Sequence, residues 1–184
     1  KVPPVSESDA WDLAKGMERA ATERKLRLYR FSGNLGALSR INCPAVLEMT
    51  LPGLDGSRFV ALVNLEQDRL TVDPPLGGRK SLFFHEMETH WSGKGFLLWN
   101  DYLDLLGSVR PGSAGEPVRR IQGLLREAGA YNRPETGVYD SGTLAAVRAF
   151  QRSRGLDPDG LAGSQTLMSL YAAADHFTMP RLGA

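Results

Sequence analysis

A run of glycine, proline and serine near the middle of the chain, from Gly107 to Ser113, divides the sequence into two parts with different patterning. Such a cluster marks a connection between structured segments, because glycine and proline interrupt helices and strands. Before it, apolar residues occur mostly in short runs separated by turn signals, and after it they follow helical spacing. We therefore expect two domains, residues 1–107 and residues 108–184, and an α+β fold class.

The composition is that of an ordinary globular protein, with 42% apolar and 23% charged residues among 184. A net charge of +1, without any basic run of patch size, gives no indication of nucleic-acid binding. No apolar stretch reaches the ~20 residues that a membrane-spanning helix needs. Because the sequence begins with Lys1 rather than methionine, we expect it to be part of a longer protein.

The first part of the chain predicts a helix followed by an antiparallel sheet. The apolar residues on one face of that helix are Trp11, Ala14, Met17 and Ala21. The segments with the pattern of strands are residues 26–31, 45–51, 59–65, 69–72 and 95–99. A strong turn signal at residues 52–56 links the second and third of these strands, and residues 81–90 are expected to form a short helix.

The second part predicts three helices. The apolar residues expected on their inner faces are Val118, Ile121, Leu125 and Ala128, then Leu144, Val147 and Phe150, and finally Leu167, Leu170, Tyr171 and Ala174. Pro117 near the first position and Gly129 after the last one fit the two ends of the first helix. Helices this short are marginal alone, so they must share one core.

A sequence repeat lies inside the second part. Residues 137–144 align with residues 160–167, and both consist of a glycine, an apolar residue, a turn, and then Thr-Leu entering a helix. Asp140 and Gly163 are the expected N-caps, and each threonine falls at the third helical position. Capping chemistry used twice is one interpretation, and a pair of related binding positions is the other.

The second part also carries a family pattern. Its residues are Arg110-Pro111-Gly112-Ser113, Val118-Arg119-Arg120-Ile121-Gln122, Leu124-Leu125, Gly129, Thr136-Gly137-Val138-Tyr139-Asp140, Thr143, Ala146-Val147, Phe150-Gln151, Gly155-Leu156, Asp159-Gly160, Gly163 and Thr166. This set resembles the peptidoglycan-binding domain found beside many cell-wall hydrolases. The resemblance covers about residues 109–174. It implies a three-helix bundle with a shallow groove for the peptide stem or glycan of peptidoglycan.

The candidate ligand-binding residues are polar side chains near the loop–helix junctions, which we expect to be exposed. They are Asp140, Thr143, Gln151, Asp159 and Thr166. Helix N-termini at these junctions can present free N–H groups to a carboxylate. This stretch has no histidine, no cysteine and no acidic cluster that could act as a base or nucleophile, so binding without cleavage is expected. Alternatively, Asp140 only caps its helix and Gln151 only bonds a loop carbonyl.

A second family pattern lies in the first part, in residues 38–49, 58–63, 72–74, 91–93 and 96–99. These segments resemble the second half of the bacteriocin-processing cysteine peptidase domain, which has a papain-like α+β fold. Arg58 stands where that family has its histidine, Asp73 matches its aspartate, and residues 1–11 lack its cysteine. Because arginine cannot act as a base at ordinary pH, the resemblance implies a degenerate domain that is not an enzyme.

The competing hypothesis is a peptidoglycan-active cysteine enzyme that uses Cys43 with His85 or His90 and Asp73. It requires the Cys43 sulfur within about 3–4 Å of an imidazole. The two histidines are five residues apart, which on a helix separates them by ~140°, whereas a zinc protease motif needs a spacing of four. We therefore expect no metal and no cofactor, and a small buried role for Cys43.

The order of the two parts resembles the periplasmic region of the A component of the general (type II) secretion pathway. In that family a cytoplasmic ATPase and one transmembrane helix precede this region, and the protein helps to place the outer-membrane secretin through the cell wall. The resemblance implies a periplasmic location. It implies two partners, peptidoglycan and an inner-membrane secretion-system protein.

Overall fold

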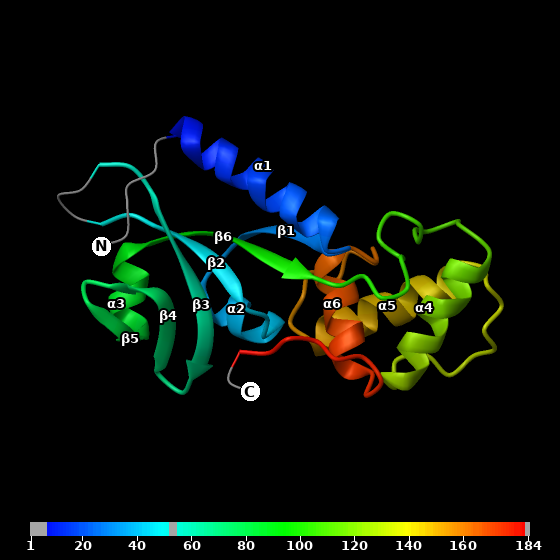
Figure 1. Ribbon diagram of the computed structural model, residues 1–184. Helices are drawn as coiled ribbons and strands as arrows, with labels where there is room; N and C mark the ends of the chain where they lie inside the picture. Colours follow the sequence, from blue (N-terminus) through cyan, green and yellow to red (C-terminus); the bar gives the residue numbers. More distant parts are fainter. Residues whose placement is uncertain (1–6, 52–54, 183–184) are drawn as a thin grey trace. The chain divides into compact units, whose positions relative to one another are not determined.

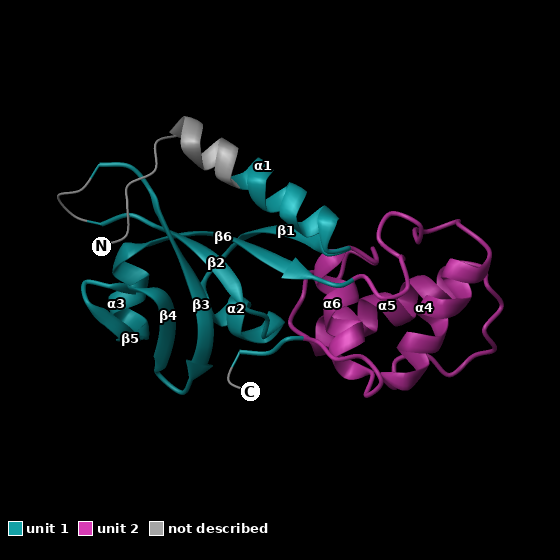
Figure 2. Ribbon diagram, viewed as in Figure 1, with its two compact units in different colours: residues 1–100, 180–184 teal, residues 101–179 magenta. Residues whose placement is uncertain are grey.

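The computed structural model describes residues 7–51 and 55–182, with side chains from Ala14 onward (Figure 1). The chain forms two compact units, residues 1–100 with 180–184, and residues 101–179 (Figure 2). Each unit buries its own set of apolar side chains. Within the described ranges, no helix combines the length and the apolar character that a membrane crossing requires.

The first unit is built on an antiparallel sheet with the strand order β1-β6-β2-β3-β4-β5. The strands are β1 (Arg27–Ser32), β2 (Ala45–Met49), β3 (Arg58–Glu66), β4 (Arg69–Leu76), β5 (Arg79–Phe83) and β6 (Trp91–Trp99). Alternate residues of β2 and β3 are buried, as expected for strands with one face on the core. Leu47 and Val60, for example, lie opposite each other on the buried face. The α+β class predicted from the sequence is confirmed.

Three helices complete the described part of the first unit: α1 (Glu7–Glu23), α2 (Leu35–Ile41) and α3 (Phe84–His90). Helix α1 packs beside β1, and its residues Ala14 and Ala21 are buried as predicted. The side chain of Trp11, which the sequence places on the same face, lies outside the described residues, as do residues 52–54 of the predicted turn.

Two predictions for the first unit need correction. The helix predicted at residues 81–90 begins only at Phe84, because the preceding residues pair with β4, with Leu82 opposite Leu70. Helix α2 was not predicted at all. Its seven residues are too few for a clear helical period, although the Asn34 side chain caps it by accepting a hydrogen bond from the Ala37 N–H at 2.8 Å.

The second unit contains α4 (Glu116–Glu127), α5 (Ser141–Ser153) and α6 (Ser164–Ala173). The three predicted helices are confirmed. Their buried apolar side chains include Val118, Ile121, Leu125, Val147, Phe150, Leu167, Leu170 and Tyr171. The predicted N-caps Asp140 and Gly163 are also confirmed. The segments that connect these helices hold Asp140 and Asp159, whereas Thr143, Gln151 and Thr166 lie on α5 and α6.

Candidate functional site

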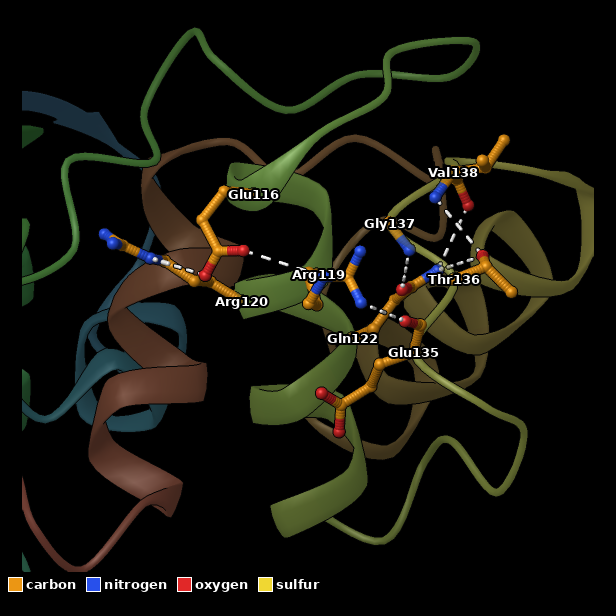
Figure 3. Close-up of polar contacts among 8 residues, drawn as sticks. All are labelled: Glu116, Arg119, Arg120, Gln122, Glu135, Thr136, Gly137 and Val138. Atoms are coloured by element: carbon orange, nitrogen blue, oxygen red, sulfur yellow. Dashed lines mark hydrogen bonds and ion pairs between the residues drawn. The ribbon is translucent and has the colours of Figure 1, made fainter.

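The side chain of Gln122, on α4, fastens the loop that leads into α5. Its carbonyl oxygen accepts a hydrogen bond from the Gly137 N–H at 2.9 Å. Its amide donates to the Val138 carbonyl at 3.1 Å and to the Thr143 hydroxyl at 2.8 Å. Figure 3 shows this side chain reaching the loop, where the Thr136 hydroxyl also lies 3.4 Å from the amide nitrogen. We call this set of residues the first junction.

The side chain of Gln151, on α5, does the same for the loop that leads into α6. Its carbonyl oxygen accepts from the Gly160 N–H at 2.9 Å. Its amide donates to the Leu161 carbonyl at 3.1 Å, to the Thr166 hydroxyl at 3.1 Å and to the Asp159 carboxylate at 2.8 Å. We call this set the second junction.

The two junctions are copies of one structural unit. The corresponding pairs are Gln122 and Gln151, Thr136 and Asp159, Gly137 and Gly160, Val138 and Leu161, and Thr143 and Thr166. The repeat in residues 137–144 and 160–167 was predicted from the sequence, but the glutamine that organises each copy was not. The available signal was an Arg-x-x-Gln spacing, which begins at Arg119 in one copy and at Arg148 in the other.

Thr143 and Thr166 are buried, and so is Gln151, which corrects the expectation that these residues are exposed. Each threonine hydroxyl donates to the carbonyl of the exposed loop residue, at 3.2 Å to Val138 and 3.2 Å to Leu161, and accepts from the glutamine amide. Each of these polar atoms has a hydrogen-bond partner within its junction, which is why the side chains can be buried. These three residues hold the loops in shape.

The carboxylates of Asp140 and Asp159 remain exposed. Asp140 accepts hydrogen bonds from the Thr143 N–H at 2.8 Å and from its hydroxyl at 3.1 Å, and these bonds lower the pKa of Asp140 below its ordinary value. Asp159 accepts from the Leu161 N–H at 2.7 Å. The capping role that the sequence offered as an alternative for Asp140 is confirmed. Gln151 likewise bonds a loop carbonyl, as that alternative proposed.

Each junction presents one apolar side chain to solvent. Val138 is 46% exposed and Leu161 is 47% exposed, and the two occupy equivalent positions. An arginine lies beside each loop, since Arg119 donates to the Glu135 carbonyl at 3.2 Å and Arg148 to the Asp159 carbonyl at 3.5 Å. Each loop therefore holds one exposed apolar side chain in a fixed position beside an arginine.

In the first unit, the two peptidase-like positions point to different faces of the sheet. Arg58 is buried on the face that also carries Val60, and its guanidinium donates to the Asp55 and Gly56 carbonyls at 3.3 Å. Asp73 lies opposite Ala61, on the other face, and its exposed carboxylate is 3.5 Å from the Lys80 ammonium. The arginine therefore fastens a turn, and the aspartate forms an ion pair with a lysine.

The Cys43 thiol is enclosed. Burial raises its pKa to about 11, so the nucleophilic thiolate is scarce at neutral pH. The hydrogen-bond partner of its sulfur among the described residues is the Leu98 carbonyl, at 3.8 Å. The ring of His85 stacks on Phe83. The buried Nδ1 of His90 has no hydrogen-bond partner among the described residues. In residues 14–51 and 55–182, no three His, Cys, Asp or Glu side chains are grouped as metal ligands.

Residues 114–170 match the family model described as a putative peptidoglycan binding domain. This range contains both junctions and most of the helical bundle.

Three curated relatives illustrate the wider similarity. General secretion pathway protein A of Aeromonas hydrophila is 27% identical over 180 residues, which cover 94% of this chain and 32% of that protein. The spore cortex-lytic enzyme of Oceanobacillus iheyensis is 38% identical over 68 residues, covering 37% of this chain and 25% of the enzyme. The zinc D-Ala-D-Ala carboxypeptidase of Streptomyces albus G is 37% identical over 81 residues, covering 40% and 30%. The chain thus spans about a third or less of each relative.

A solved structure, a periplasmic domain of the EpsAB fusion protein of the Vibrio vulnificus type II secretion system, aligns with a TM-score of 0.47 and 24% identity. The alignment covers 85% of this chain and 68% of that one. Among the sequence relatives, the lytic enzymes match the binding domain alone, whereas the Aeromonas hydrophila protein matches nearly the whole chain.

Proposed function

We propose that this chain, whose second unit carries a peptidoglycan binding domain, attaches to the bacterial cell wall through that unit and does not cut it. The match of residues 114–170 to the family model carries the proposal. A spore cortex-lytic enzyme and a zinc D-Ala-D-Ala carboxypeptidase share similarity with this chain over 68 and 81 residues. These matches cover 25% and 30% of the two enzymes, which leaves most of each enzyme to supply its catalytic part.

The proposed ligand-binding surface surrounds the two junctions. The exposed carboxylates of Asp140 and Asp159 can accept hydrogen bonds from stem-peptide amides, and Val138 and Leu161 offer apolar contacts. The buried side chains of Thr143, Gln151 and Thr166 do not contact the ligand in this proposal, and they fix the loop backbone by hydrogen bonds. Rigid loops lose little conformational entropy on binding, which favours affinity.

The proposed task of the first unit is non-catalytic. Two observations support this. The guanidinium of Arg58, which the resemblance aligns with the family histidine, is bonded to turn carbonyls, and the Cys43 thiol is enclosed with a raised pKa. Residues 1–107 are then a degenerate peptidase-like domain and residues 108–184 the wall-binding domain. The similarity over 180 residues to General secretion pathway protein A suggests the larger role. In that role the chain lies in the periplasm and guides assembly of the outer-membrane secretin beside an inner-membrane partner protein.

Co-sedimentation with purified insoluble peptidoglycan tests the proposal. The whole chain should pellet with the wall, and analysis of the supernatant should find no released muropeptides. Leu161→Asp places a charge on the second junction and should reduce pelleting at least fivefold. Val63→Asp is the matched control, because Val63 is an equally exposed apolar residue of the first unit. Equal loss in both variants, or release of muropeptides, contradicts the proposal.

A further inference from the structure

A groove of about 250 Å³ lies along α4 in the second unit. None of the five residues predicted to bind a ligand lines this groove. Its apolar walls are Leu103, Leu124 and Phe177. Gly123 adds no side chain to its lining, and a Cβ atom there would make an ordinary contact, at 3.8 Å, with the Glu135 carboxylate. The groove has the size for one amino-acid residue of a ligand rather than for a protein helix.

Charges of both signs line this groove. Glu116 lies between two arginines, 3.6 Å from Arg119 and 3.5 Å from Arg120 (Figure 3). Farther along α4, Glu127 lies 3.5 Å from the Nδ1 of His176. These ion pairs are long, and their side chains are about half-exposed, so each pair contributes little to stability. A charged group of a ligand can therefore replace either partner at a small cost in free energy. Glu135 differs, because Arg126 holds its carboxylate at 2.6 Å.

The groove continues into the first junction. Glu135 lines the groove, and the next residues along the chain, Thr136, Gly137 and Val138, form the junction loop that Gln122 fastens. Arg119 serves both, since its guanidinium faces Glu116 and also donates to the Glu135 carbonyl. The groove and the first junction therefore meet at Arg119 and Glu135.

We propose that the groove binds the residue of a peptidoglycan stem that carries a free ammonium and a free carboxylate together. The ligand carboxylate pairs with Arg119 and Arg120, and the ammonium pairs with Glu127. The apolar walls contact the methylene chain of that residue. A surface of mixed charge discriminates against polyanions, and a neutral sugar gains nothing from it. This inference rests on the proposed wall binding and names the part of the wall that is recognised.

The test uses the whole chain and the soluble tripeptide L-Ala–γ-D-Glu–meso-diaminopimelate, with its N-terminal amine blocked. A second, equally blocked tripeptide carries an acetyl group on the side-chain ammonium of diaminopimelate. NMR titration of the unmodified tripeptide should shift the backbone amides of Gly123, Glu127 and His176. Arg120→Gln and Glu127→Gln should each weaken its binding about tenfold. Acetylation should weaken binding to the parent chain equally, and should add little to the loss in Glu127→Gln. Arg152→Gln, on the exposed side of α5, is the control that should bind as the parent does.

Sedimentation with insoluble peptidoglycan separates the two proposals. If the parent chain pellets but the tripeptide leaves the groove amides unshifted, the groove assignment is wrong and wall binding stands. Equal affinity for the two tripeptides also overturns the assignment, because recognition of the ammonium is its central claim. If the parent chain neither pellets nor binds the tripeptide, both proposals fail.

Discussion

Gln122 and Gln151 perform the same task in two successive loops of the second unit. Each side-chain carbonyl accepts a hydrogen bond from the N–H of a glycine at 2.9 Å, and each amide donates to the carbonyl of the next residue at 3.1 Å. Each glutamine is buried, so these bonds are shielded from water. The two junctions thereby fix the positions of the exposed side chains of Val138 and Leu161.

The first prediction concerns these glutamines. Gln122→Ala or Gln151→Ala should lower the free energy of unfolding by about 3 kcal/mol, because each leaves buried donors and acceptors unpaired. Urea unfolding followed through the NMR signals of the second unit measures the loss. Arg152→Ala, an exposed position on the helix that carries Gln151, should change stability by less than about 0.5 kcal/mol. Equal stability of the glutamine variants and this control would contradict the structural role.

The second prediction ranks three glycines with left-handed backbone conformations. Gly112, Gly137 and Gly160 have φ of 84°, 72° and 80°. Alanine at Gly112 meets no atom within 4 Å and should cost only the conformational penalty of about 1 kcal/mol. Alanine at Gly137 would contact the Gly115 carbonyl at 3.2 Å and should cost more.

Gly160→Ala should also cost more than Gly112→Ala, by about 1 kcal/mol, because its Cβ would overlap the end of the Leu144 side chain, which must move aside. Thermal unfolding of the three variants checks the order. A Gly160→Ala protein as stable as Gly112→Ala would refute the tight approach of α5 to the second loop.

The repeat was predictable because it depends on local chemistry. A glycine that must adopt positive φ, a cap and a threonine at a fixed spacing leave a mark in the sequence over eight residues. The burial of Thr143 and Thr166 was not predictable from that mark. It depends on Gln122 and Gln151, which belong to the preceding helices and meet the loops only after the bundle has packed.

The sheet illustrates the same limit. The pattern of β2 and β3 was clear since one face is buried. The sequence predicted a single helix over residues 81–90, where the structure has the end of strand β5 and then helix α3. Both elements are too short for their apolar residues to show a clear strand or helix period. The neighbouring strand β4 decides the outcome through backbone pairing, which a local pattern does not contain.

The third prediction concerns pH and Asp140. Its hydrogen bonds with Thr143 depress its pKa in the folded protein, so the ionised carboxylate stabilises the fold above its unfolded pKa of about 3.9. This stabilisation is lost as pH falls through the lower, folded pKa. Asp140→Asn keeps an acceptor for the cap but cannot titrate. From about pH 5 to about pH 2 the melting temperature of the parent should therefore fall more than that of Asp140→Asn. Parallel pH profiles would show that the cap does not depend on charge.

The fourth prediction concerns the Cys43 thiol. With a raised pKa of about 11 and a buried side chain, it should react with a thiol reagent at neutral pH at least a hundredfold more slowly than an exposed cysteine. The matched control is Arg152→Cys in a Cys43→Ser background, which places one thiol on an exposed helix surface. Denaturant should remove the difference. Rapid labelling of Cys43 in the folded chain would revive a catalytic role for it.

The last prediction concerns where the second unit begins. The Asp101 carboxylate accepts hydrogen bonds from the Tyr171 hydroxyl at 2.7 Å, from the Leu105 N–H at 3.1 Å and from the Leu106 N–H at 2.8 Å. Burial raises the pKa of Tyr171, and without Asp101 its hydroxyl would lose this acceptor. A fragment of residues 101–179 should therefore fold and pellet with insoluble peptidoglycan, whereas residues 1–100 should stay in the supernatant.

A fragment of residues 108–179 should be less stable than residues 101–179 by about 2–3 kcal/mol for two causes: it loses the hydrogen bonds of Asp101, and it loses the buried side chain of Leu105. The variant Tyr171→Phe separates the lost hydrogen bond from the lost packing, because it removes the hydroxyl that donates to Asp101. In the longer fragment Tyr171→Phe should be destabilising, and in the shorter one it should be neutral or stabilising. If both fragments unfold at the same urea concentration, Asp101 is only part of a connection, and the unit begins at the glycine-rich segment that the sequence indicates.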